Sequence, residues 1–256
     1  MYKRQVYGLL EWPWGRGGGT ESGHFRNRGI LLACMLTGDR HLLEAANDAR
    51  DCVAFKIGTG RFAQMGAPNR DTGNNMQILL DAYLLTSDEK YLKLCDKASA
   101  AASFDAVTKR TGRAPGRGEA WQYCLYLKSL ARLIETKAER GVKDTDSIDS
   151  YLKYCRAIQS RMARPSRSGR RRGGGGWSLL ACESMMTAAE LTDDPAEKKK
   201  FIEAAEQSFR GLDRLVREDG KAGFWNSKAT TMHLQGGGRY MRWATANQPT
   251  TQPASE

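Results

Sequence analysis

Three copies of a short phrase decide how this chain folds: LTGD at residues 36–39, LTSD at 85–88 and LTDD at 191–194. Each copy follows an apolar segment and precedes a more charged one. The aspartate is a favourable first residue for a new helix, because its carboxylate accepts hydrogen bonds from the free N–H groups of the first turn. The phrase therefore predicts a helix, a tight turn and a second helix.

The spacing of the phrase predicts a repeat architecture. Thr37 and Thr86 stand 49 positions apart, and Thr192 follows Thr86 after 106. A degenerate copy is therefore expected near position 136, where Thr136 is found. Units of about 50 residues that each form one helical hairpin indicate a helical-repeat protein.

Hydrophobic periodicity predicts an all-α chain of paired helices. In each pair the first helix is more apolar and the second more charged, so the first helices should pack inside. The longest apolar run, 30–36, is too short for a membrane span and is interpreted as a buried helix segment. The hairpins could form an open superhelix or a closed ring around a cavity. The expected helices are 22–37, 40–55, 73–86, 89–104, 118–137, 146–162, 177–191, 195–217 and about 229–243.

Composition favours an anionic partner. The chain has 256 residues, 40% of them hydrophobic, and a net charge of +11, which points to nucleic acid, an acidic polysaccharide or an anionic surface. The basic loop Arg164–Arg172 is interpreted first as a solvated linker, with nucleic-acid binding as the alternative. The six cysteines lack metal or redox spacing and are expected in the core. Neither a metal nor another cofactor is predicted.

The two ends of the sequence are expected to lie outside the domain, which we place at 6–245. MYKRQ, residues 1–5, matches the translation of a sequencing adapter, which indicates a gene fragment from environmental sequencing whose natural start lies upstream. The segment 246–256 is expected to be a disordered tail. Localisation cannot be predicted from such a start.

The hairpins SGHFRNRGILLACMLTGDRHLLEAA and NRDTGNNMQILLDAYLLTSDEKYLKLC resemble those of the six-hairpin, or (α/α)6 toroid, carbohydrate-active enzymes. These include glycoside hydrolases and toroid-type polysaccharide lyases. The resemblance covers most of residues 20–217 as a repeat signature. It implies an incomplete (α/α) toroid, a neutral or acidic polysaccharide as substrate, and a secreted or periplasmic protein.

In such a toroid the first turns of the inner helices line the cavity. Hydrolysis would need two carboxyl groups, whereas β-elimination of a uronate needs a base and a group that neutralises the substrate carboxylate. The catalytic candidates are Glu21, His24, Glu119 and Tyr123. The candidates for substrate binding are Arg26, Arg28, Asp71, Asn74, Asn75, Trp121, Gln122, Trp177 and His233.

Each candidate also has a plain structural interpretation. Asp71 and Asn74 could cap helix ends, His24 could be a buried histidine, and each tryptophan could fill space between hairpins. The alternative function is accordingly a non-catalytic helical-repeat module that binds an anionic partner. The two interpretations differ in whether His24, Asn74 and either Glu119 or Tyr123 converge on one concave site.

Overall fold

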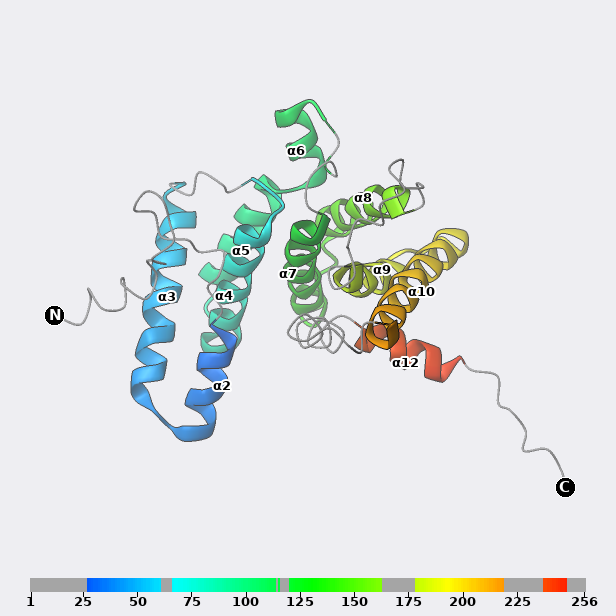
Figure 1. Ribbon diagram of the computed structural model, residues 1–256. Helices are drawn as coiled ribbons and strands as arrows, with labels where there is room; N and C mark the ends of the chain where they lie inside the picture. Colours follow the sequence, from blue (N-terminus) through cyan, green and yellow to red (C-terminus); the bar gives the residue numbers. More distant parts are fainter. Residues whose placement is uncertain are drawn as a thin grey trace, which may run out of the picture. The chain divides into compact units, whose positions relative to one another are not determined.

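The computed structural model describes residues 27–60, 66–113, 115, 120–162, 178–218 and 237–247 (Figure 1). These residues form helices and the turns that join them, and none of them lies in a β-strand. The all-α prediction is confirmed. The helices are α2 (Arg28–Thr37), α3 (Arg40–Gly58), α4 (Arg70–Thr86), α5 (Glu89–Ala101), α6 (Phe104–Thr111), α7 (Ala120–Ala138), α8 (Thr145–Met162), α9 (Ser178–Leu191), α10 (Pro195–Glu218) and α12 (Gly238–Ala246).

Most predicted helix bounds agree with the structure to within three residues, but α2 begins at Arg28 and α12 at Gly238, later than the predicted starts at 22 and about 229. The repeat pattern also does not predict α6. It begins after Ser103, whose hydroxyl accepts a hydrogen bond from the Ala106 N–H at 3.4 Å. It ends at Gly112, which has φ 66°. A serine before the first turn and a glycine after the last are both helix-end signals. The bounds of α6 are therefore specified by local sequence and not by the repeat.

The Leu-Thr-Gly-Asp phrase forms a compact hydrogen-bonded turn between α2 and α3. The Thr37 hydroxyl donates to the Ala33 carbonyl at 2.7 Å, and the Asp39 N–H donates to the Thr37 hydroxyl at 3.3 Å. The Asp39 carboxylate then accepts from the His41 N–H at 2.8 Å. Gly38 between them has φ 70°, a left-handed conformation that glycine adopts without strain. The turn thus satisfies free backbone groups of both helices.

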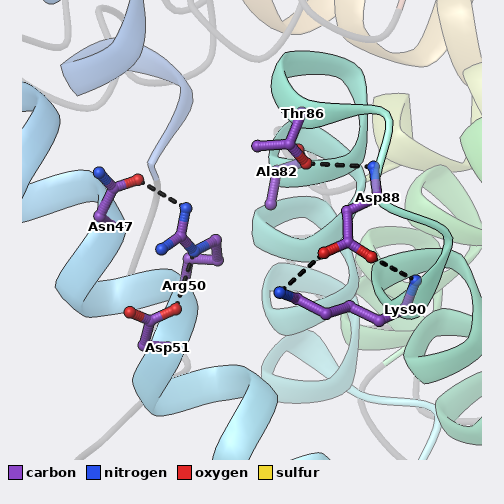
Figure 2. A network of polar contacts seen from close by, with 7 residues as sticks. All are labelled: Asn47, Arg50, Asp51, Ala82, Thr86, Asp88 and Lys90. Carbon is purple, nitrogen blue, oxygen red and sulfur yellow. Dashed lines mark hydrogen bonds and ion pairs between the residues drawn. The ribbon is translucent and has the colours of Figure 1, made fainter.

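The same turn recurs in the other two copies of the phrase. Asp88 donates its N–H to the Thr86 hydroxyl at 3.3 Å and caps α5 with its carboxylate (Figure 2). Ser87 takes the left-handed place of the glycine, with φ 54°. Asp194 likewise donates its N–H to the Thr192 hydroxyl at 3.3 Å and caps α10. The repeat read from the sequence is therefore a repeat of turn chemistry.

Thr136, the expected fourth copy, does not form this turn. It is buried within α7, which continues to Ala138. The next helix is capped instead by Asp144, whose carboxylate accepts from the Ser147 N–H at 3.1 Å. The turn has moved towards the C-terminus because the phrase at 136 lacks the aspartate two residues after the threonine.

The chain divides into two units, residues 1–154 and 155–256, and the boundary falls within α8. In the first unit, α4 and α7 pack side by side and run in the same direction. The Ser129 hydroxyl donates to the Gly73 carbonyl at 2.7 Å, and Arg132, one turn further along α7, contacts Asp81, two turns further along α4, at 2.6 Å. Contacts that advance together along both helices define a parallel pair.

The outer helices of the first two hairpins are also parallel. The Arg50 guanidinium of α3 lies 5.7 Å from the ring centre of Tyr91 in α5. Further along both helices, the Lys97 ammonium donates to the Gly58 carbonyl at 2.9 Å. Parallel inner helices and parallel outer helices are the packing of a helical repeat, so the helical-repeat prediction is confirmed.

The second unit contains the end of α8 with α9, α10 and α12. Arg156 donates to Glu197 through Nε and through Nη2, the latter at 2.9 Å, and Gln159 donates to the Lys200 carbonyl at 2.8 Å. The contacts again advance together, so α8 and α10 are parallel here. The apolar helix α9 is buried over most of 180–189.

Burial confirms the inner position of α4 but not that of α2. Every residue from Thr72 to Ala82 is buried except Gln77. In α2, by contrast, Leu32, Met35 and Leu36 are 51%, 72% and 86% exposed. The prediction that 30–36 is buried is wrong for these residues. Of the cysteines, Cys95, Cys124, Cys155 and Cys182 are buried and Cys34 and Cys52 are half-buried.

The exposure of α2 follows from where its hairpin sits on α4. Asn27 and Leu31, at the start of α2, line one cavity together with Leu85 and Thr86, at the end of α4. The first hairpin is therefore displaced along α4, and its turn extends beyond the neighbouring turn (Figure 1). Aligning the repeats by their threonines predicts that α2 and α4 begin at the same level in the layer. The structure does not show this.

Candidate functional site

The polar end of the inner layer is formed by the first turns of α4 and α7. Because these helices are parallel, Asp71, Asn74 and Asn75 lie at the same end of the layer as Gln122 and Tyr123. The start of α4 is fixed by Asn69, whose side chain accepts from the Thr72 N–H at 3.0 Å. We call this region the polar end.

The polar side chains at the polar end are buried to different degrees. Asn75 is 1% exposed and Asn74 is 8% exposed, whereas Asp71 and Gln122 are half-buried. All four take part in polar or electrostatic contacts. The half-buried pair is therefore the better placed to meet a ligand, and the two asparagines also contribute to the packing of the helix ends.

Tyr123 is held in an aromatic cluster. Its ring stacks on Tyr154 with the centres 6.1 Å apart, and Tyr154 also meets Tyr126 and Phe104 edge to face at 5.8 and 5.2 Å. The Tyr154 hydroxyl donates to the Ala102 carbonyl at 2.8 Å. Burial raises the pKa of Tyr126 and of Tyr154 above the ordinary value. The cluster joins α6, α7 and α8 and fixes the Tyr123 ring.

Arg28 lies at the other end of α4. The neighbouring Asn27 lines a cavity with Thr86, which is 12 residues after Asn74. At 1.5 Å per residue, Thr86 and the Asn27 beside it stand about 18 Å along the helix axis from Asn74. The structure does not bring Arg28 to the polar end. The other candidates, namely Glu21, His24, Arg26, Glu119, Trp177 and His233 and the side chain of Trp121, lie outside the described residues.

A polar ladder between α4 and α7 was not found from the sequence. Ser129 donates to the Gly73 carbonyl, Gln77 accepts from Arg132 at 2.7 Å, and Arg132 contacts Asp81. Asp81 is 6% exposed and the Arg132 side chain 16%. The spacing of four residues from 73 to 77 to 81 places the α4 members on one stripe, and this spacing was the available signal.

Gly73 allows the ladder to form. An added Cβ at this position would lie 2.7 Å from the Leu125 carbonyl oxygen and 2.9 Å from its carbon. These are backbone atoms of α7, so they cannot rotate away. The two inner helices are in contact at their backbones here, which sets their axial register.

A cavity of about 420 Å³ lies among α5, the start of α6, α7 and the start of α8. It is lined largely by carboxylates and hydroxyls, which include Asp96, Asp105, Asp144, Asp149, Ser99 and Ser150. Lys137 contacts two of the carboxylates, and Lys153 contacts two more at 2.7 Å each. Four of the five lining aspartates thus contact a lysine of the same unit, and the two ammonium groups offset two of the five negative charges.

The ion pair between Lys137 and Asp144 shifts the pKa of both groups. Burial alone would raise the pKa of Asp144, but hydrogen bonds from Lys137 and Ser147 outweigh it and lower that pKa. Burial alone would lower the pKa of Lys137, but the hydrogen bonds to Asp144 and Asp96 raise it. Both groups therefore stay charged at neutral pH, as expected for a structural ion pair.

A second cavity, of about 350 Å³, lies between the first hairpin and the end of α4. Arg50 stands on its polar side, where it donates to Asn47 and to Asp51 at 2.8 Å each (Figure 2). Across from it, Asp88 and Lys90 form an ion pair at 2.7 Å. Leu31, Leu43 and Leu85 form the apolar side.

Comparison with known proteins identifies no relative: no family model, no curated protein and no solved structure matches the chain. Among the described residues, no three His, Cys, Asp or Glu side chains are gathered in a way that could hold a metal ion. None of the helices in the described ranges combines the length and apolar character of a membrane span.

Proposed function

We propose that this chain is part of an (α/α) toroid domain of a carbohydrate-active enzyme that acts on a polysaccharide at the polar end of its inner helices. The observation that supports this most is the parallel packing of α4 and α7. It gathers Asp71, Asn74, Asn75 and Gln122 at one end of the layer. In a toroid, further inner helices would add their first turns to the same end.

The residue types at this end suit sugar recognition. Amide and carboxylate groups offer both donors and acceptors to hydroxyl groups. An amide can also hydrogen-bond a uronate carboxylate and stabilise the charge that develops during β-elimination. We assign Asp71 and Gln122 to substrate binding because they are the half-buried members. Asn74 and Asn75 are assigned to the same role from a more buried position.

Chemistry at such a site needs a proton donor and acceptor. His24, Glu21 and Glu119 are our candidates outside the described residues, and Tyr123 is the candidate within them. A lyase would use His24 or Tyr123 to remove the proton beside the uronate carboxylate. A hydrolase would use two of the carboxyl groups as acid and as base or nucleophile.

The proposal is tested by incubating the purified chain with a panel of neutral and acidic polysaccharides. Unsaturated uronate, measured by ultraviolet absorbance, reports a lyase, and new reducing ends without that absorbance report a hydrolase. His24→Ala and Glu119→Gln should each reduce the rate by about 10²-fold or more if they carry acid–base steps. Absence of products and of binding with every polysaccharide would contradict the proposal.

A matched pair of variants tests the polar end itself. Gln122→Ala should raise KM for the active substrate. Gln159→Ala removes a glutamine of similar exposure in the second unit and should leave KM unchanged. Equal effects of the two variants would assign Gln122 a structural role only.

The second candidate is a non-catalytic module that binds an anionic partner, and the net charge of +11 favours it. Binding would then weaken as salt rises, because phosphate or carboxylate contacts release counterions. Replacing Arg170, Arg171 and Arg172 with Gln should weaken binding of a single-stranded RNA probe and flatten its salt dependence. Unchanged binding would exclude the basic loop as the nucleic-acid contact.

A further inference from the structure

The exposed apolar face of the first hairpin is the feature that the proposed function does not use. Leu32, Met35 and Leu36 on α2 and Leu43 on α3 are all exposed. Leu85, at the end of α4, is 49% exposed. Single exposed leucines need no explanation, but a group of large apolar side chains on adjoining elements marks an interaction surface.

These side chains belong to the tip of the first hairpin and the adjoining end of α4. Leu31, Leu43 and Leu85 line the same cavity of about 350 Å³ between α2, α3 and α4. Met35 follows Leu31 by one helical turn, and Leu32 and Leu36 are spaced by one turn on the adjoining stripe. We call Leu32, Met35, Leu36, Leu43 and Leu85 the tip surface. The cavity supplies a recess at its edge, on the Leu31 side of α2.

The charge of this region differs from that of the whole chain. Residues 28–44 contain two arginines and two acidic residues, so the hairpin tip is neutral, whereas the chain carries +11. Charges further away than about 10 Å are largely screened at physiological salt. Two copies could therefore meet at this surface without the repulsion that other surfaces would produce.

The same tip offers complementary charges to a second copy. Arg40 and Glu44 are exposed and stand one helical turn apart on α3. A two-fold axis beside α3 would set Arg40 of one copy opposite Glu44 of the other, and the reverse. An apolar centre with such a rim is the usual anatomy of a protein interface.

We propose that the tip surface is a self-association site, at which two copies of this chain pair through their first hairpins about a two-fold axis. The recess lined by Leu31, Leu43 and Leu85 would receive Met35 or Leu36 of the partner copy. The inference does not depend on the proposed enzymatic function, since the tip surface and the polar end lie at opposite ends of α4.

Sedimentation velocity of the purified chain over a wide concentration range tests the proposal. We expect a monomer–dimer equilibrium that sodium chloride does not weaken, because apolar burial dominates it. Met35→Glu and Leu36→Glu should each raise the dissociation constant by about tenfold or more, as loss of a buried large side chain implies. A chain that stays monomeric at every concentration would overturn the proposal.

Two control variants separate this surface from general stickiness. Val142→Glu and Met241→Glu change apolar residues that are 50% and 57% exposed but lie outside the tip surface. They should leave the dissociation constant unchanged, and thermal unfolding should confirm that all four variants are folded. Equal weakening by the control variants would also overturn the proposal.

Discussion

The first hairpin and the α4–α7 pair share a sequence signature but differ in how their apolar helices pack. The Leu-Thr-small-Asp turn lies at 36–39 in the first hairpin and at 85–88 at the end of α4, and in both regions it follows an apolar helix. In α4 that helix is buried against α7, whereas in α2 much of it is exposed. The shared signature therefore specifies the hairpin and not how the hairpin packs on its neighbour.

What separates the two regions is long-range contact. Gly73 lets α4 and α7 meet at their backbones, and the Asp81–Arg132 ion pair joins them further along. The first hairpin meets α4 and α5 through contacts such as Arg50 with Tyr91, and a cavity remains between them. These contacts fix the register between α4 and α7 tightly, whereas the first hairpin is displaced along α4.

The largest effect is expected from breaking the buried ion pair. Arg132→Met should lower the free energy of unfolding by about 3–5 kcal/mol, because it leaves the buried Asp81 carboxylate without its cation. Arg50→Met in the first hairpin is the matched change, and we expect about 1 kcal/mol or less, since its partner Asp51 is 65% exposed. Urea denaturation measures both. Similar losses would show that the two regions are equally dependent on ion pairs.

The next effect concerns one glycine in each region, Gly73 in α4 and Gly29 in α2. Gly73→Ala should destabilise the protein by about 1–3 kcal/mol, because the new methyl group meets the Leu125 backbone. Gly29→Ala should be neutral or stabilise by up to about 1 kcal/mol, since nothing lies within 4 Å of an added Cβ there and alanine favours helix. A stabilising Gly73→Ala would contradict the close approach of α4 and α7.

The hairpins could be predicted from sequence because their turns are local. Asp39, Asp88 and Asp194 cap helices as expected, since each contact spans only two residues. At Thr136 the prediction fails, because the threonine alone does not make the turn and the helix continues past it. Sequence spacing located the units, while the chemistry of the aspartate determined where helices start.

The relative placement of hairpins could not be predicted, because it depends on contacts between residues about 40 to 55 positions apart. The displaced first hairpin separates Arg28 from Asn74, although the repeat alignment placed them together. Tyr123 lies in an aromatic cluster built from α6, which the sequence pattern did not reveal. Asp71, Asn74, Asn75 and Gln122 were grouped at one end by the parallel helices, as the repeat predicts.

A smaller effect tests whether the turns are equivalent in the two regions. Asp39→Ala and Asp88→Ala each remove one capping carboxylate, and each should cost about 1 kcal/mol of unfolding free energy. The difference in tertiary packing between the two regions should not change this loss of free energy, because both capping contacts are local. A much larger loss for Asp88→Ala would show that its turn also supports the packing between hairpins. Asp48→Ala, an exposed change within α3, serves as the control.

The smallest effect is expected from pH, at the turn where the repeat phrase has lost its aspartate. The pKa of Asp144 is lowered in the folded state, chiefly by Lys137 acting against the opposing effect of burial. Its ion pair therefore stabilises the fold above the ordinary carboxyl pKa of about 4, and this contribution is lost as pH falls through the lowered folded value. Asp144→Asn should flatten the acid limb of the stability curve by a fraction of a kcal/mol to about 1 kcal/mol. Urea denaturation at a series of acidic pH values measures the limb, and an acid limb in Asp144→Asn that matches the parent curve would contradict a role of this ion pair in acid sensitivity.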